Sequence, residues 1–171
     1  MNRSDYVILM TADRIRRTVQ RIAHEVSELN AADHPVVLFG INQRGFTLAT
    51  MLKELLSGLL DTSVTADQLA ADEGLFNGDN YASVADGANS PFIIVVDDVI
   101  FSGQTMFKAL RTVISALDPA EVYTAVLVDR GHRKIPVRAE FCGMRLPTKL
   151  DEHVSVLTED NKIKEVVLTH H

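Results

Sequence analysis

The segment Phe92–Thr105, FIIVVDDVIFSGQT, decides the fold of this chain. It begins with an unbroken apolar run rich in Ile and Val, which is typical of a buried strand in a parallel sheet. Two adjacent carboxylates, Asp97 and Asp98, follow the run, and a Ser-Gly-Gln-Thr turn then leads into a stretch with helical spacing. This order predicts a ligand site at the carboxyl end of the strand, where α/β sheets usually bind ligands.

The turn Ser102–Thr105 has the chemistry of a phosphate cradle. Gly103 allows the backbone to approach an anion closely. The N–H groups of the turn and the dipole of the following helix favour negative charge, and the hydroxyls of Ser102 and Thr105 add hydrogen bonds. Because the chain has neither a Walker A motif nor a G-x-G-x-x-G motif, the cradle is not that of a P-loop or dinucleotide-binding protein.

The carboxylates of Asp97 and Asp98 emerge side by side from the buried strand. Such a pair is costly unless cations or hydroxyl donors satisfy it, and ribose hydroxyls with a nearby magnesium ion meet that need. Taken alone, the pair also fits a strand-end acid beside a helix cap. The whole ordered string favours the ligand site.

The rest of the chain alternates predicted strands and helices. Helices are expected over 12–30, 45–59 and 106–118, and strands over 36–40, 63–69, 92–96, 122–128, 139–143 and 153–157. In the first helix, Ile15 through Leu29 form an apolar face at spacings of three and four, with Thr11 as the N-terminal cap and Asn30 at the end. The alternation predicts a mostly parallel sheet covered on both faces.

Residues 60–91 are expected to include a long surface loop, because the segment is rich in Gly, Asn, Asp and Ser. Long loops inside compact domains are often functional lids. Residues 54–107 contain nine acidic residues and no Lys or Arg, so the overall net charge of −6 conceals an acidic middle between mildly basic ends.

The bulk composition excludes several classes of protein. A length of 171 residues fits one domain. The net charge argues against generic nucleic-acid binding, one cysteine excludes an intramolecular disulfide, and no apolar run reaches the roughly 18–20 residues of a membrane span. We therefore expect a soluble cytoplasmic protein. The scattered histidines show no zinc pattern, and His170 and His171 are expected to be disordered or left from a tag.

Several motifs in the same order resemble one family. The string VVDDVIFSGQT resembles the phosphoribosyl-pyrophosphate (PRPP) motif of type I phosphoribosyltransferases, and RIRRTVQRIAHEV, GINQRG and VLVDRGHRKIPVRAEFCGMRLPT resemble the pyrimidine-operon attenuation regulator and uracil phosphoribosyltransferase family. The similarity covers residues 11–59 and 92–158. It implies one α/β domain over 1–171 with a mostly parallel central sheet flanked by helices and a small hood. The composition of residues 60–91, and not the resemblance, predicts the mobile acidic loop region of this domain.

The resemblance also implies roles for individual residues. It assigns pyrophosphate to the loop of Gly40, Ile41, Asn42, Gln43, Arg44 and Gly45, the ribose hydroxyls to Asp97 and Asp98, the 5′-phosphate to Ser102, Gly103, Gln104 and Thr105, and the base to Val128–His132 in the hood, with Arg130 and His132. Asp97, Asp98 and Arg44 would be catalytic, and magnesium would be held at Asp97 and Asp98, mainly through the substrate. Independently, a loop with glycines at both ends suits an anion; a simple turn at 40–45, and a solvated loop at Arg130 and His132, remain alternatives.

The implied reaction transfers phosphoribosyl from PRPP to uracil, giving UMP and pyrophosphate. Three features depart from the family. Asn42-Gln43 stands where relatives have Lys-Thr, Phe101 stands where they have Tyr, and residues 60–91 lack the basic lid. Two interpretations stay open: a transferase with a different lid, or a nucleotide-sensing regulator of weak activity that binds RNA or a protein partner.

Family members commonly form dimers, and their regulators bind RNA through a basic dimer surface. The residues that would supply such a surface here are Arg14, Arg17, Arg21, His24, Arg130, His132, Arg133, Lys134 and Arg138. The alternative is that these charges are simply solvated. Salt-sensitive RNA affinity would favour the regulator.

Overall fold

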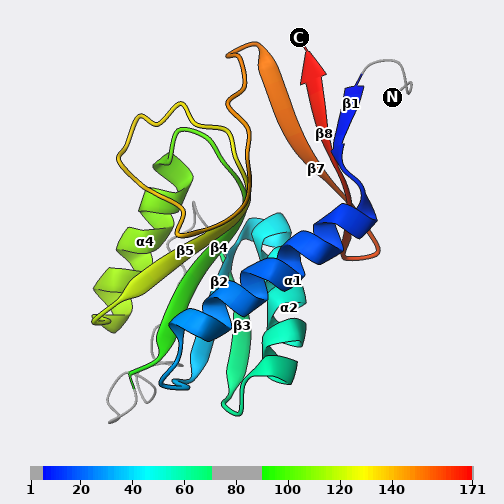
Figure 1. The fold of residues 1–171 in the computed structure, drawn as a ribbon. Helices are drawn as coiled ribbons and strands as arrows, with labels where there is room; N and C mark the ends of the chain where they lie inside the picture. The colour runs from blue at the N-terminus through cyan, green and yellow to red at the C-terminus, as the bar shows by residue number, and fades with distance from the viewer. Residues whose placement is uncertain (1–5, 71–89, 171) are drawn as a thin grey trace.

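A computed structural model describes residues 6–70 and 90–170 (Figure 1). The elements in chain order are β1 (Tyr6–Met10), α1 (Ala12–Leu29), β2 (Val36–Ile41), α2 (Asn42–Leu59), β3 (Val64–Leu69), β4 (Phe92–Ile100), α4 (Gln104–Leu117), β5 (Val122–Asp129), β6 (Phe141–Arg145), β7 (Glu152–Glu159) and β8 (Lys162–His170).

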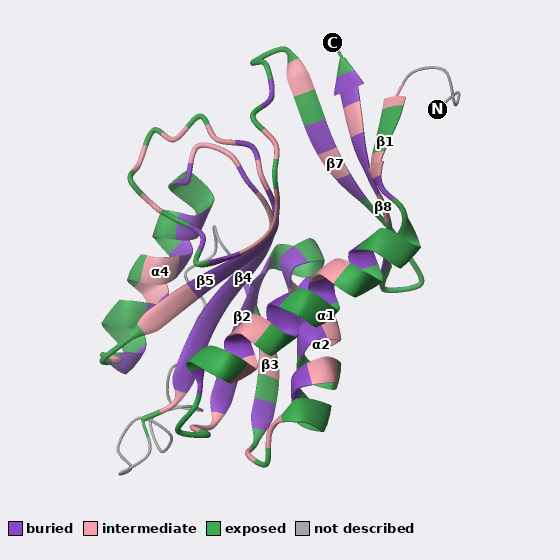
Figure 2. Ribbon diagram, viewed as in Figure 1, coloured by how far each residue is buried: buried purple, intermediate pink, exposed green. Residues whose placement is uncertain are grey.

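Five of the strands form a parallel sheet in the order β3-β2-β4-β5-β6. Helices α1 and α2 cover one face and α4 covers the other, as Figure 1 shows. The central strand β4 is buried on both faces (Figure 2), because alternate residues enter opposite cores. Ile94 packs into the core under α1 and α2, and Ile93 packs into the core under α4. The expected α/β fold with a parallel sheet between helices is confirmed.

The ends of α1 follow the sequence prediction. The Oγ1 of Thr11 accepts a hydrogen bond from the N–H of Arg14 at 3.4 Å. At the other end the side chain of Asn30 donates to the carbonyl of His34 at 2.8 Å and accepts from the N–H of His34, which joins the helix end to the approach to β2. Leu29, the last residue of α1, was expected on the apolar face but is 48% exposed.

A second sheet, the hood, consists of three antiparallel strands in the order β1-β8-β7. It unites the two ends of the described chain, which lie side by side in Figure 1. The sequence analysis identified neither β1 nor β8, because each is stabilised by a partner at the opposite end of the chain. The structure contradicts the disorder expected for His170, which ends β8 and pairs in register with Glu152. His171 lies outside the described residues.

Two predicted boundaries move in ways that matter for function. Helix α2 begins at Asn42, so the segment 40–45 is not a loop, and β4 continues to Ile100, so Asp97 and Asp98 lie within the strand. Strand β3 confirms the strand expected at 63–69. Residues 71–89 of the predicted acidic loop lie outside the described part. None of the described helices is long and apolar enough to cross a membrane.

Candidate active site

Two glycines make the connection between β2 and α2 abrupt. A Cβ on Gly40 would lie 2.3 Å from the Cα of Phe46, and a Cβ on Gly45 would lie 2.6 Å from the carbonyl oxygen of Val96. Only glycine permits such close approach of backbone to backbone. Asn42 completes the turn with a φ of 52°, a left-handed conformation that asparagine tolerates better than most residues.

The first turn of α2 is thereby pressed against the carboxyl end of β4. Arg44 Nη1 lies 3.9 Å from Asp98 Oδ2, and the arginine side chain remains 58% exposed while that of Asp98 is 13% exposed. The first turn of α2 contains no acidic residue and no side-chain cap. The helix N-terminus and Arg44 therefore present positive charge beside the acidic pair.

The two carboxylates differ in their surroundings. Asp97 is buried, with 9% of its surface exposed, whereas Asp98 is half-buried. Each accepts the N–H of the residue that follows it: Asp98 N donates to Asp97 Oδ1, and Val99 N donates to Asp98 Oδ1, both at 2.9 Å. Burial, and then the neighbouring charge of Asp98, raise the pKa of Asp97 well above its ordinary value. Ionising both carboxylates therefore costs free energy unless a cation or a hydrogen-bond donor stabilises them.

The predicted phosphate cradle lies between β4 and α4. Gly103 is the N-terminal cap of α4, with a φ of 82°. Because glycine has no side chain, no side-chain hydrogen bond caps the first N–H groups of the helix. The hydroxyl of Ser102 accepts from the N–H of Gln104 at 3.4 Å. The first turn of α4, which includes Thr105, contains no acidic residue. Its N–H groups suit an anion, as the sequence indicated.

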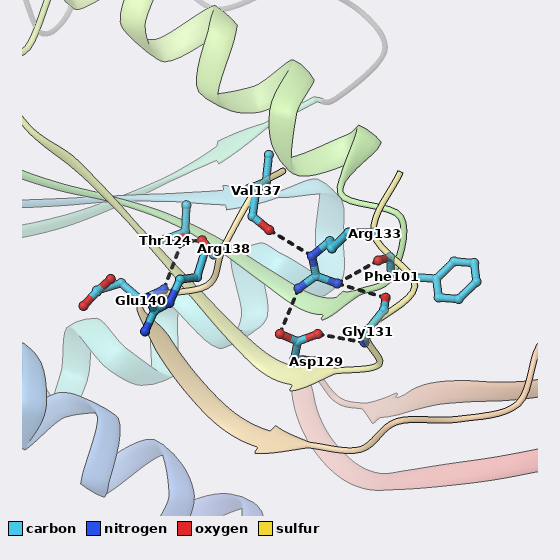
Figure 3. A network of polar contacts seen from close by, with 8 residues as sticks. All are labelled: Phe101, Thr124, Asp129, Gly131, Arg133, Val137, Arg138 and Glu140. Atoms are coloured by element: carbon cyan, nitrogen blue, oxygen red, sulfur yellow. Dashed lines mark hydrogen bonds and ion pairs between the residues drawn. The ribbon is translucent and has the colours of Figure 1, made fainter. Parts of the chain in front are cut away.

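Arg133 is hydrogen-bonded to the backbone at the start of the phosphate cradle, a contact that the sequence analysis missed. Figure 3 shows its guanidinium among Asp129, Gly131, Phe101 and Val137, while the ring of Phe101 points away. Nη1 donates to the carbonyl of Phe101 at 2.7 Å, and Nη2 pairs with Asp129 Oδ2 at 2.8 Å. The only sequence signal for this ion pair was the four-residue spacing of Asp129 and Arg133 in DRGHR. Such a spacing is typical of ion pairs in helices, but this segment follows a strand.

The solvated loop considered as an alternative does not describe Arg130, which is buried, whereas His132 is exposed. Arg130 is 5% exposed; its Nε donates to Thr148 Oγ1 at 3.1 Å, and its Nη2 donates to the carbonyl of Glu152. Its guanidinium lies 4.4 Å from the ring centre of Phe101, and burial lowers the pKa of Arg130. The exposed residue His132 lies across the same ring, with ring centres 5.3 Å apart.

The segment 128–132 therefore lies at the end of β5 and in the loop that follows. It is not part of the hood sheet, which corrects the expected placement. Arg130 ties the segment to the hood instead, because Glu152 is the first residue of β7.

Most of the arginines considered for an RNA surface have protein partners. Arg17 pairs with Asp13, and Arg21 pairs with Glu25 while donating to the carbonyls of residues 142 and 143. Arg14 donates to the carbonyl of Leu9 at 3.1 Å. These α1 side chains are nevertheless exposed, so their charge still reaches solvent.

The acidic pair also fits a magnesium ion in part. Carboxylate oxygens are ligands that magnesium prefers, and the ion commonly binds through one or two carboxylates plus substrate phosphates. Among residues 6–70 and 90–170, no group of three or more His, Cys, Asp or Glu could hold a metal ion. The donor set of Asp97 and Asp98 thus suits an ion that is held largely by the substrate.

Comparison with known proteins identifies the family. The model of the phosphoribosyl transferase domain matches residues 9–160. The Bifunctional protein PyrR of Chloroflexus aurantiacus is 36% identical over 171 residues, covering 94% of this chain and 93% of that protein. The chain belongs to the phosphoribosyltransferase family. PyrR of Staphylococcus epidermidis is 34% identical over 163 residues, covering 90% of this chain and 92% of the relative.

Solved structures confirm the type I phosphoribosyltransferase fold. The hypoxanthine phosphoribosyltransferase of Trypanosoma cruzi superimposes with a TM-score of 0.73 at 18% identity, covering 95% of each chain. HGPRT-ase from Leishmania tarentolae, in complex with GMP, gives a TM-score of 0.75 at 17% identity, covering 99% of this chain and 100% of that one. As a type I phosphoribosyltransferase that resembles PyrR, the chain has the fold that its motifs predicted.

Proposed function

We propose that the protein transfers the phosphoribosyl group of PRPP to uracil, forming UMP and pyrophosphate. The observation that carries the proposal is the convergence of Arg44, the buried Asp97 and Asp98, and the N-terminal turn of α4 at the carboxyl end of β4. PyrR relatives are similar over nearly the whole chain. The convergence supplies donors for phosphate groups and acceptors for sugar hydroxyls within one edge of the sheet.

In this proposal the cradle Ser102–Thr105 binds the 5′-phosphate through its amides and hydroxyls. Asp97 and Asp98 accept hydrogen bonds from the ribose hydroxyls, which relieves the cost of the acidic pair. Residues 40–45 receive pyrophosphate, with Arg44 as the charged group. The backbone of Val128–His132 is expected to contact the base, because it borders the same edge of the sheet.

The proposed reaction breaks the bond between the anomeric carbon and pyrophosphate and forms a bond from that carbon to N1 of uracil, which loses its proton to solvent. Catalysis would consist mainly of positioning the two substrates and stabilising the charge of the leaving group. Arg44 serves the second purpose. Magnesium bound by Asp97 and Asp98 together with PRPP would supply further positive charge for pyrophosphate.

A turnover assay that mixes PRPP, uracil and magnesium and measures UMP tests this function. UMP formation that requires all three components is the expected result. Guanine and hypoxanthine serve as controls for the base, since solved relatives of the same fold include hypoxanthine phosphoribosyltransferases. Turnover of a purine but not uracil would keep the family chemistry and reject the proposed base.

A nucleotide-sensing regulator is the second candidate, and residues 42–43 favour it. Asn42-Gln43 supplies no cation at the N-terminus of α2, where pyrophosphate charge builds up. The relatives named PyrR are called bifunctional. A regulator would bind UMP or PRPP without appreciable turnover, and would bind RNA as a homodimer through exposed charges such as Arg17, Lys134 and Arg138.

Binding of UMP in the absence of UMP formation would select this second function. RNA affinity that falls steeply with salt concentration would extend it to an RNA-binding regulator, and sedimentation equilibrium would test the dimer. For either function we propose a cytoplasmic location, which a chain with one cysteine suits.

A further inference from the structure

Residues 133–135 donate hydrogen bonds to two successive backbone carbonyls, those of Phe101 and Ser102, at the start of the phosphate cradle. The carbonyl of Phe101 accepts from Arg133 Nη1 at 2.7 Å. The carbonyl of Ser102 accepts from the N–H groups of Lys134 and Ile135 at 3.0 and 3.2 Å. Because the C=O and N–H of a trans peptide point in opposite directions, each bond turns the N–H of its peptide to the other side of the loop.

The N–H groups turned in this way belong to Ser102 and Gly103. Within residues 6–70 and 90–170, neither donates a hydrogen bond to a protein acceptor. Gly103 is buried, and a Cβ added to it would lie 3.1 Å from the carbonyl of Ile135 and 3.4 Å from Cδ of Arg133. The loop is therefore packed against Arg133 on one side and has unpaired donors on the other.

All three guanidinium nitrogens of Arg133 are engaged within the protein. Besides its bond to Phe101, Nη1 donates to the carbonyl of Gly131 at 3.0 Å; Nε donates to the carbonyl of Val137 at 2.9 Å, and Nη2 pairs with Asp129 (Figure 3). Only 21% of the arginine side chain is exposed. Asp129 also neutralises its charge, and accepts the N–H of Gly131 at 2.9 Å.

We infer that Arg133, held by Asp129, is a positioning residue that sets the Ser102 and Gly103 amides for the 5′-phosphate. The inference rests on the proposed function, because it concerns the same phosphate site. Arg133 acts through its planar, forked geometry and not as a charge offered to the ligand. A lysine keeps the charge but cannot bridge several carbonyls at fixed angles.

The test compares UMP with uridine, which lacks only the phosphate, in the wild-type chain, Arg133→Lys and Arg133→Gln. Affinities are measured by titration followed through the amide NMR signal of Gly103. We expect UMP affinity to fall about tenfold or more in both variants, with uridine affinity unchanged and lysine no better than glutamine. Arg111→Gln is the matched control, since Arg111 is an exposed arginine of α4 that belongs to neither proposed site.

Asp129→Asn is the second variant, in case replacement of Arg133 prevents folding. Its amide oxygen can still accept the N–H of Gly131, but the charge that holds Arg133 is lost. We expect a smaller loss of UMP affinity than in the Arg133 variants, again without change for uridine.

Each other outcome has a defined meaning. Wild-type affinity in Arg133→Lys would show that charge alone suffices, and equal losses for UMP and uridine would show a general structural role; either overturns the inference. A wild-type chain that does not bind UMP rejects the proposed function itself. Binding by the wild-type chain with an unaffected Arg133→Lys variant rejects only the role of Arg133.

Discussion

Arg44 at the start of α2 and Asp98 near the end of β4 form an ion pair with Nη1 and Oδ2 3.9 Å apart. The pair joins the segment expected to bind pyrophosphate to the segment expected to bind ribose. It is too long and too exposed on the arginine side to stabilise the fold appreciably. Arg44 can therefore turn from Asp98 to an incoming phosphate group at little cost.

Arg44→Ala is expected to lower kcat/KM for PRPP by about 10²-fold, because it removes charge stabilisation from the leaving group. Its melting temperature should stay within about 1 °C of the wild-type value, given the small worth of an exposed pair. Arg16→Ala is the matched control, since Arg16 forms an exposed ion pair with Asp13 at 2.8 Å on α1. An equal loss of activity in both variants would argue against a specific role.

Asp97→Asn should stabilise the ligand-free protein while weakening its binding of PRPP and UMP. The folded protein raises the pKa of Asp97, so the folded state holds a proton that the unfolded state has already lost. Stability therefore declines as pH rises from about 4, the ordinary aspartate pKa, through the raised pKa of the folded state. The asparagine removes this decline and can still accept the N–H of Asp98.

Thermal unfolding between about pH 4 and pH 8 measures the effect on stability, each kcal/mol gained raising the melting temperature by about 2–4 °C. Titration with UMP measures the effect on binding. A variant that loses stability at neutral pH would contradict the cost assigned to the buried carboxylate.

Gly103→Ala is expected to destabilise the protein by about 1–2 kcal/mol from its left-handed φ alone. The added Cβ would also lie 3.1 Å from the carbonyl of Ile135, so the total loss should be larger. Gly131→Ala separates the two effects, because Gly131 has a φ of 75° but no atom within 4 Å of an added Cβ. Denaturant unfolding of both variants measures the difference, and equal losses would mean that the loop yields without strain.

Asn42→Lys should raise PRPP affinity several-fold by returning a cation to the N-terminus of α2. The φ of 52° at this position favours asparagine over lysine, so a cost of about 1 kcal/mol in stability is expected. Asn42→Gln imposes a similar backbone cost without the charge. Titration with PRPP distinguishes the two variants, and equal affinities would show that charge at residue 42 is irrelevant.

The sequence predicted the α/β class and the main sheet because these depend on local patterns. The apolar run at 92–96 required a buried central strand, and the three- and four-residue spacing in 12–30 required an amphipathic helix with a cap at Thr11. The acidic pair and the Ser-Gly-Gln-Thr turn were also recognisable, since their chemistry is carried by adjacent residues.

The hood and the contacts behind the site were decided only by the tertiary structure. Strands β1 and β8 pair across the whole length of the chain, so neither carries a sufficient signal by itself. Arg130 and Arg133 look like surface charges in a basic segment, yet each donates to a carbonyl from a distant part of the backbone, that of Glu152 and that of Phe101. A side chain's residue type specifies how many hydrogen bonds it can form, but only the folded chain determines which groups come within reach of it.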